Sequence, residues 1–141
     1  MKIYIIGSLK NLTTPIVGRS LRLLGHEVFD DWFAGGPTAD EHWRKYHQAR
    51  GDTYAQALRG KAGDNVFKFD MRHLADADAA LLVLPAGKSA HMELGVVHGW
   101  GRPTYVYFGD GEPEDWDLMY KITDAQFFDL DKLIYHFGRM L

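Results

Sequence analysis

The sequence predicts an α/β fold: a single-domain, doubly wound (flavodoxin- or Rossmann-like), mainly parallel sheet of about five strands with helices on both faces. Three observations support this prediction. Short apolar runs alternate with segments of helical periodicity along the chain. Residues 2–6 form a nearly continuous apolar run, which is typical of a central strand covered on both faces. The 141 residues are 46% hydrophobic, enough for one core, and no change of composition divides residues 1–141 into two domains.

A strand, a helix and a second strand are expected at the start of the chain. The first strand is predicted at Lys2–Ile6. A helix follows, because Thr13 or Thr14 supplies a capping hydroxyl and Pro15 suits a first helical turn. After a glycine that ends this helix, His26–Phe29 has the pattern of a short second strand. This order favours parallel pairing of the two strands.

Residues 30–63 break the alternation of strands and helices and are predicted to be an insertion. They begin with a loop rich in aromatic and flexible residues, and polar helical stretches follow around 40–49 and 53–59. An insertion of this kind in a small α/β domain usually covers a site.

Helices and strands alternate through the rest of the chain. Apolar runs of strand length are separated by segments with helical spacing of apolar residues. Helices are predicted at residues 65–77, 91–100, 116–122 (a short one) and 130–139. Strands are predicted between them at residues 79–84, 104–108 and 126–128.

Composition and charge exclude several kinds of partner. The formal net charge is −3 and the charges are interspersed, so no basic stripe is present that would follow a nucleic-acid polymer. The absence of cysteine excludes disulfides, thiolate nucleophiles and cysteine metal sites. The apolar run at Ile3–Ile6 is too short for a signal or membrane-spanning segment. We therefore expect a soluble, cytoplasmic protein without a membrane partner.

The turn Gly87-Lys88-Ser89, between a predicted strand and a predicted helix, resembles the end of a phosphate-binding P-loop. The glycine that such a loop needs five residues earlier is Leu82, inside the strand, so the loop is too short for a nucleoside triphosphate. The turn is a candidate for binding one phosphate or a sugar hydroxyl through backbone N–H groups. An ordinary solvated turn is the alternative interpretation.

No cofactor site is indicated. Residues 7–12, after the first strand, lack the second and third glycines of a dinucleotide fingerprint. The seven histidines form no familiar metal-binding pair with a carboxylate. We therefore expect neither a nicotinamide nor a metal.

Two carboxylates and a tyrosine are the candidates for chemistry. Glu93 lies near the start of the helix after a buried strand, where the helix dipole would hold it anionic and suited to nucleophilic attack. Asp70 lies in an otherwise apolar helical window, where an unpaired charge is costly. Tyr4, inside the first strand, needs a partner for its hydroxyl if it is buried. The alternatives are a carboxylate that only stabilises the helix start, an outward-facing aspartate and a core tyrosine.

Four elements, in this order, resemble the nucleoside 2-deoxyribosyltransferase family, including its 2′-deoxynucleoside 5′-phosphate N-hydrolases. The resemblance covers most of the chain except the insertion, and it implies cleavage or transfer at the N-glycosidic bond of a (deoxy)nucleoside or nucleoside 5′-monophosphate. The elements are Tyr4 through Ser8, Asp70 with Asp78 eight residues later, His91-Met92-Glu93-Leu94-Gly95, and Asp117-Leu118-Met119 with Ala125-Gln126-Phe127.

The resemblance also implies roles for single residues. Glu93 matches the family's nucleophile, which attacks the anomeric carbon and forms a glycosyl-enzyme intermediate. Tyr4 would hydrogen-bond to that carboxylate, and Asp70 would contact the base or assist its protonation. Asp117 and Met119 fall where relatives place residues of a neighbouring subunit over the sugar, so the resemblance implies a homo-oligomer.

Further contacts to the substrate are expected at the two turns that follow the first and third strands. These are Gly7 and Ser8 in one turn and Gly87, Lys88 and Ser89 in the other. Many transferases carry an aspartate at the position of Gly87, whereas relatives that act on 5′-monophosphates carry a hydroxyl-bearing residue there. This departure leaves open whether the 5′ end is phosphorylated and whether the reaction is transfer or hydrolysis.

Two aromatic residues of the insertion are candidate contacts to the substrate. Trp32 and Phe33 are candidates for stacking on a base, with packing beneath the loop as the other interpretation.

A non-catalytic nucleotide-binding or sensing module on the same fold is the main alternative to an enzyme. A structural protein that docks through the insertion is a third hypothesis.

Overall fold

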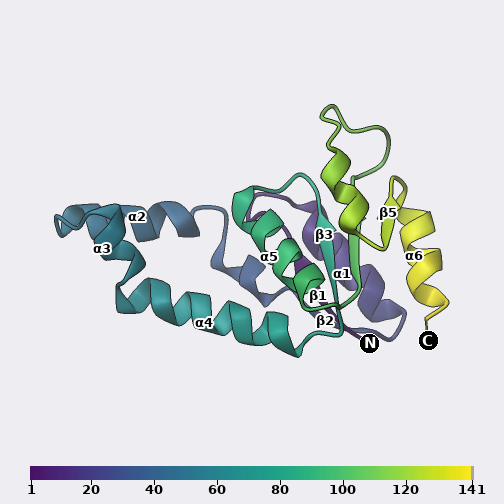
Figure 1. Cartoon of the computed structure of the whole chain (residues 1–141), viewed down its shortest axis with the longest axis horizontal. Helices are drawn as coiled ribbons and strands as arrows, with labels where there is room; N and C mark the ends of the chain where they lie inside the picture. Colours follow the sequence, from purple (N-terminus) through teal and green to yellow (C-terminus); the bar gives the residue numbers. More distant parts are fainter. Residues whose placement is uncertain (141) are drawn as a thin grey trace.

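The chain, a computed structural model described over residues 1–140, forms one parallel sheet with helices on both faces (Figure 1). Leu141, the last residue of the predicted domain, lies outside the described residues. The strand order is β2-β1-β3-β4-β5 and every neighbouring pair is parallel. This is the order of a flavodoxin-like doubly wound fold, so the predicted fold class is confirmed. The strands are β1 (Lys2–Ile6), β2 (Glu27–Phe29), β3 (Ala79–Val83), β4 (Thr104–Tyr107) and β5 (Ala125–Phe127).

Alternate residues of the strands pack into two cores, one on each face of the sheet. Ile3 and Ile5 of β1 belong to one core, and Tyr4 and Ile6 belong to the other, because successive side chains of a strand point to opposite faces. All residues of β3 are buried. A central parallel strand is covered on both sides, so its sequence is a continuous apolar run.

Two pairs of helices cover the two faces. α1 (Thr13–Leu23) and α6 (Leu130–Gly138) pack on the first core, and α4 (Lys61–Asp76) and α5 (Lys88–Gly99) pack on the second. A short 3-10 helix, η2 (Leu118–Ile122), precedes β5. Across residues 1–140, no helix has both the length and the apolar character that crossing a lipid bilayer requires.

Two helices begin earlier than predicted. α4 begins at Lys61, because its first turn is polar and exposed and therefore lacks the apolar spacing that marks the rest. α5 begins at Lys88, with Gly87 in the cap position. The stretch Gly87-Lys88-Ser89 is therefore the start of a helix and not a turn that precedes one.

The capping of α1 also differs from prediction. Neither predicted threonine caps the helix, since Thr13 is already helical and Thr14 is buried within it. Asn11 takes this role instead, because its Oδ1 accepts a hydrogen bond from the Thr13 N–H at 3.1 Å. An asparagine two residues before an unpaired backbone N–H of the first helical turn makes the same hydrogen bond that a capping hydroxyl would make.

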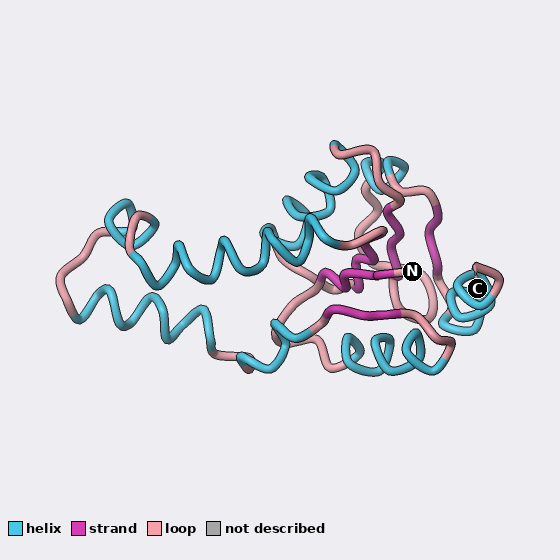
Figure 2. Tube along the Cα trace, turned by 90° about the horizontal axis from the view of Figure 1, so that it is seen from below, coloured by secondary structure: helices cyan, strands magenta, loops and turns pink. Residues whose placement is uncertain are grey.

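The predicted insertion becomes an arm that projects from the sheet (Figures 1 and 2). It contains η1 (Asp31–Gly35), α2 (Ala39–Ala49), α3 (Tyr54–Leu58) and the first half of α4.

The arm has a small interior of its own. His47 is buried and its Nδ1 lies 2.8 Å from the Asp52 carboxylate. At Gly60 a Cβ atom would lie 3.1 Å from the His47 ring, so glycine permits the close approach of α3 and α4 to α2.

Candidate active site

A cavity of about 730 Å³ lies at the carboxyl ends of β1 and β3, between the arm and the start of α5. β1 pairs with β2 on one side and β3 pairs with β4 on the other, so this is the point where the strand order reverses. Open α/β sheets bind ligands at such points. The volume falls within the range of about 300–1,000 Å³ that small-molecule sites occupy.

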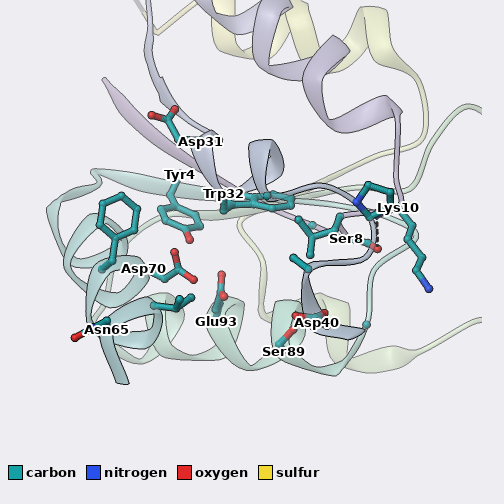
Figure 3. A pocket seen from close by; sticks show the side chains of 18 residues that line it. Tyr4, Ser8, Lys10, Asp31, Trp32, Asp40, Asn65, Asp70, Ser89 and Glu93 are labelled. Atoms are coloured by element: carbon teal, nitrogen blue, oxygen red, sulfur yellow. Dashed lines mark hydrogen bonds between the residues drawn. The ribbon is translucent and has the colours of Figure 1, made fainter. Parts of the chain in front are cut away.

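Three side chains that the sequence singled out meet in this cavity. Tyr4 comes from β1, Asp70 from α4 and Glu93 from α5, and all three line it. Figure 3 shows the tyrosine hydroxyl and the two carboxylates directed toward one another. Asp70 therefore faces inward, so the outward-facing interpretation is wrong. Flanking charges could not indicate this, because the direction of Asp70 depends on where α4 packs.

Glu93 is largely buried, and this environment decides its charge. Burial raises the pKa of Glu93 to about 7, and the negative charge of Asp70 adds to the increase. Burial therefore outweighs the helix dipole, on which the prediction of an anionic Glu93 was based. Glu93 is in the second turn of α5, counted from the cap residue Gly87, and the dipole acts mainly within the first turn.

The pKa values of Asp70 and Tyr4 are also raised. Burial raises the pKa of Asp70 above its ordinary value, and the nearby His73 offsets part of this increase. Burial, then the charges of Glu93 and Asp70, raises the pKa of Tyr4, so its hydroxyl stays protonated as a donor. Within residues 1–140 this hydroxyl has no hydrogen bond to either carboxylate, so the orienting bond implied for Tyr4 stays a prediction.

Five of the other predicted contacts line the cavity. They are Gly7, Ser8, Trp32, Gly87 and Ser89. Gly7 lies in close surroundings, since a Cβ atom there would lie 3.1 Å from the Thr14 hydroxyl and would require a small shift of that side chain. The Trp32 indole Nε1 donates to the Ile5 carbonyl at 2.7 Å, which holds the ring against the end of β1.

Two predicted contacts lie outside the cavity. Lys88 faces a separate surface hollow beside Met92. Phe33 packs edge-on against Trp32, with ring centroids 6.0 Å apart. For Phe33 the packing interpretation is therefore the one that fits the structure.

Asp117 and Met119 also lie away from the cavity of their own chain. Asp117 caps η2, since its Oδ1 accepts from the Met119 N–H at 2.8 Å. Met119 is 67% exposed. Asp117 lines a different hollow of about 520 Å³, together with aromatic residues of the same segment.

The cavity includes lining residues that the sequence reasoning missed. Asn65, Val66 and Phe69 precede Asp70 on α4 and line the same end of the cavity. Helical spacing back from Asp70 would have found Val66, four residues earlier. Lys10 and Asp40 also line the cavity, but no local pattern marks them, because the arm has to fold back before Asp40 reaches it.

Metal binding is not supported in the described part of the chain. Over residues 1–140, no group of three or more histidine, aspartate or glutamate side chains is arranged to hold a metal ion.

Comparisons with known proteins give structural matches only. No family model matches the chain, and no curated protein matches it significantly. A 2-deoxyribosyltransferase from Bacillus psychrosaccharolyticus superposes with a TM-score of 0.64 at 22% identity, covering 95% of this chain and 90% of the other. A CMP N-glycosidase from Clostridium botulinum superposes with a TM-score of 0.54 at 11% identity, covering 96% of this chain and 97% of the other. The chain shares the fold of these two proteins over nearly its whole length.

Replacing Glu93 by Gln is expected to stabilise the protein at about pH 8 and to change little at about pH 4. The unfolded glutamate loses its proton near its ordinary pKa of 4.5, but the folded one keeps it until about 7. Stability is therefore lost as the pH rises from about 4.5 to about 7, by up to about 3 kcal/mol in all, and an amide avoids this loss. Urea unfolding at the two pH values measures the difference.

The control for this prediction is Glu27→Gln, because Glu27 is exposed on β2 and does not line the cavity. It is expected to leave the free energy of unfolding unchanged within about 0.5 kcal/mol at both pH values. A Glu93→Gln protein that is less stable than the wild type at about pH 8 would contradict the burial argument.

Proposed function

We propose that this protein is an enzyme that cleaves or transfers the N-glycosidic bond of a (deoxy)nucleoside or nucleoside 5′-monophosphate, with Glu93 as the nucleophile. The observation that carries the proposal is the convergence of Glu93, Asp70 and Tyr4 in one cavity at the switch point. The fold neighbours, a 2-deoxyribosyltransferase and a CMP N-glycosidase, support the same chemistry. The resemblance read from the sequence assigns these three residues to that reaction.

The proposed reaction has two steps. The ionised Glu93 carboxylate attacks the anomeric carbon, the carbon–nitrogen bond breaks, and its electron pair leaves with the base. The departing base takes up a proton from solvent, and Asp70, which lines the same cavity, contacts the base and assists this step. Water or a second base then attacks the anomeric carbon, which displaces Glu93 and gives hydrolysis or transfer.

The shape of the cavity supports one orientation of the substrate. In Figure 3, Glu93 lies between an end formed by Asn65 and Asp70 and an end formed by Ser8 and Ser89. A base at the Asp70 end places its nitrogen near the carboxyl group that is proposed to assist its protonation. The sugar 5′ end then points toward Ser8, Ser89 and the first turn of α5, where hydroxyls and backbone N–H groups are available.

Glu93→Gln is expected to lower the rate of base release by roughly 10³-fold or more, because an amide cannot form the glycosyl ester. The measurement is chromatography of free base from a panel of deoxynucleosides, ribonucleosides and their 5′-monophosphates, with and without an acceptor base. Glu27→Gln serves as the matched control and should keep wild-type rates, because Glu27 is exposed and lies outside the cavity. Full activity of the Glu93→Gln protein would exclude Glu93 as the nucleophile.

The same panel tests the alternative of a non-catalytic nucleotide-binding module. Gly87 favours this alternative, because it stands where many transferases have an aspartate and a Cβ atom there would meet open space. Calorimetric binding of a nucleotide without release of base would support the binding module and contradict the enzyme.

The pH dependence of kcat/KM is expected to show an ascending limb at about pH 7, because only the ionised form of Glu93 attacks. Asp70→Asn should move this limb to lower pH, since it removes one of the two causes of the raised pKa. The limb should remain above the ordinary pKa of 4.5, because burial is the larger cause and persists. A limb that is unchanged in Asp70→Asn would show that the two carboxylates do not interact.

We also infer that the protein acts as a homo-oligomer. The outer part of the arm, residues 42–63, carries five basic residues and one acidic residue, whereas residues 109–118 carry five acidic residues and no basic one. In Figure 1 the outer arm is at one end of the molecule, and residues 109–118 lie in the loop at the top of the view, well away from it. A contact between the two segments would therefore be a contact between copies. Both segments expose large apolar side chains, such as Leu58 at 56% and Trp116 at 81%. Exposed apolar side chains of this kind are typical of protein–protein interfaces.

Reversing two charges of the arm, Arg44→Glu with Arg59→Glu, is expected to shift the protein toward monomer in sedimentation velocity. The reversed charges would repel the acidic segment of the neighbouring copy. Arg19→Glu with Lys132→Glu is the matched control, because both residues are exposed and lie on α1 and α6. A wild-type protein that is monomeric at micromolar concentration would contradict the inference.

A further inference from the structure

His91 bridges two distant segments through its two ring nitrogens. Its Nδ1 lies 2.7 Å from the Gly87 carbonyl oxygen, and its Nε2 lies 2.8 Å from the Tyr120 hydroxyl. A carbonyl oxygen only accepts, so Nδ1 carries the hydrogen. Nε2 is then the acceptor of a hydrogen bond from the Tyr120 hydroxyl. Both nitrogens of His91 are therefore satisfied by one tautomer.

Tyr120 is a fixed anchor for this bridge. Its ring packs edge-on against Phe108 at the end of β4, with centroids 5.0 Å apart. Its carbonyl accepts hydrogen bonds from the Thr123 hydroxyl at 2.6 Å and the Gln126 side chain at 3.3 Å. Burial raises the pKa of Tyr120, so its hydroxyl keeps the proton that it donates.

The other end of the bridge is a weakly held part of the cavity wall. Gly87 and Ser89 line the cavity, and Gly87 is the cap residue of α5 without any side-chain cap. The backbone N–H of His91 is 3.4 Å from the Gly87 carbonyl, whereas the ring is 2.7 Å away. The ring is thus the closer partner of this carbonyl, and Gly87 is a residue with high backbone freedom.

We propose that His91 is a positioning residue that holds the Gly87–Ser89 wall of the cavity by tying it to Tyr120. His91 does not line the cavity, so it acts through Gly87. Glu93 is six residues after Gly87 on α5, next to Leu94, which is buried in the core beneath the helix. Loss of the bridge therefore affects binding at the Gly87 end more than the chemical step.

The test uses two single variants and their combination, and its kinetic part rests on the proposed function. His91→Asn keeps an N–H near the Nδ1 position but does not reach Tyr120, and Tyr120→Phe removes only the hydroxyl. Each is expected to raise KM by about 3- to 10-fold, the equivalent of one hydrogen bond, with kcat within about twofold. Because both remove the same contact, the double variant should be no worse than either single one.

Matched controls come from the same elements of the fold. His98→Asn changes an exposed histidine of α5, and Tyr135→Phe changes a tyrosine that is 67% exposed on α6. Both should keep the wild-type KM. Additive effects in the double variant, or a fall in kcat without a change in KM, would overturn the positioning role. If the protein binds nucleotides without turnover, the calorimetric Kd replaces KM with the same expectations.

A second measurement does not depend on any activity. Nitrogen-15 NMR of the histidine side chains is expected to show His91 as the Nδ1–H tautomer and to show a shift of its Nε2 signal in Tyr120→Phe. The opposite tautomer, or an unchanged signal, would overturn the bridge. A third outcome is that the NMR signals are as expected but the protein neither turns over nor binds nucleosides and nucleotides. This outcome would overturn the proposed function and the positioning role, and it would leave the hydrogen-bonded bridge itself in place.

Discussion

The desolvation of two facing carboxylates, Glu93 and Asp70, is the constraint on which the rest of this structure depends. Water no longer stabilises their charges fully, so both hold protons more tightly than they would in solvent. The ionisation of one carboxylate therefore opposes that of the other, and the proposed nucleophile Glu93 keeps its proton up to about pH 7. The same burial destabilises the ionised fold, and the apolar strands β1 and β3 beneath the cavity have to offset that cost.

The topology brings the two carboxylates together. α4 runs into β3 and α5 leaves it, and both helices pack on the same face of the sheet over Tyr4 and Ile6. Side chains on two such helices meet above the end of β1. The arm then closes the third side of the cavity, with Trp32 tied to the backbone of β1.

Most of the fold could be predicted because its signals are local. Strands covered on both faces read as apolar runs, and amphipathic helices show their apolar face by spacing. The errors fell where a local signal is weak: the polar first turn of α4, the start of α5 at Lys88, and a cap made by Asn11 in place of a threonine. At these positions neighbouring elements, and not the residues themselves, decide where a helix begins.

The sequence by itself determined the order of elements and named Tyr4, Asp70 and Glu93, because strand ends and charged residues in apolar windows can be read along the chain. Only the tertiary structure decided that Asp70 faces inward, that burial overrides the helix dipole at Glu93, and that Trp32 lines the cavity while Phe33 does not. The physical reason is that the direction and charge of a side chain depend on what covers it. In this protein the cover comes from an arm and helices that lie far away in the sequence.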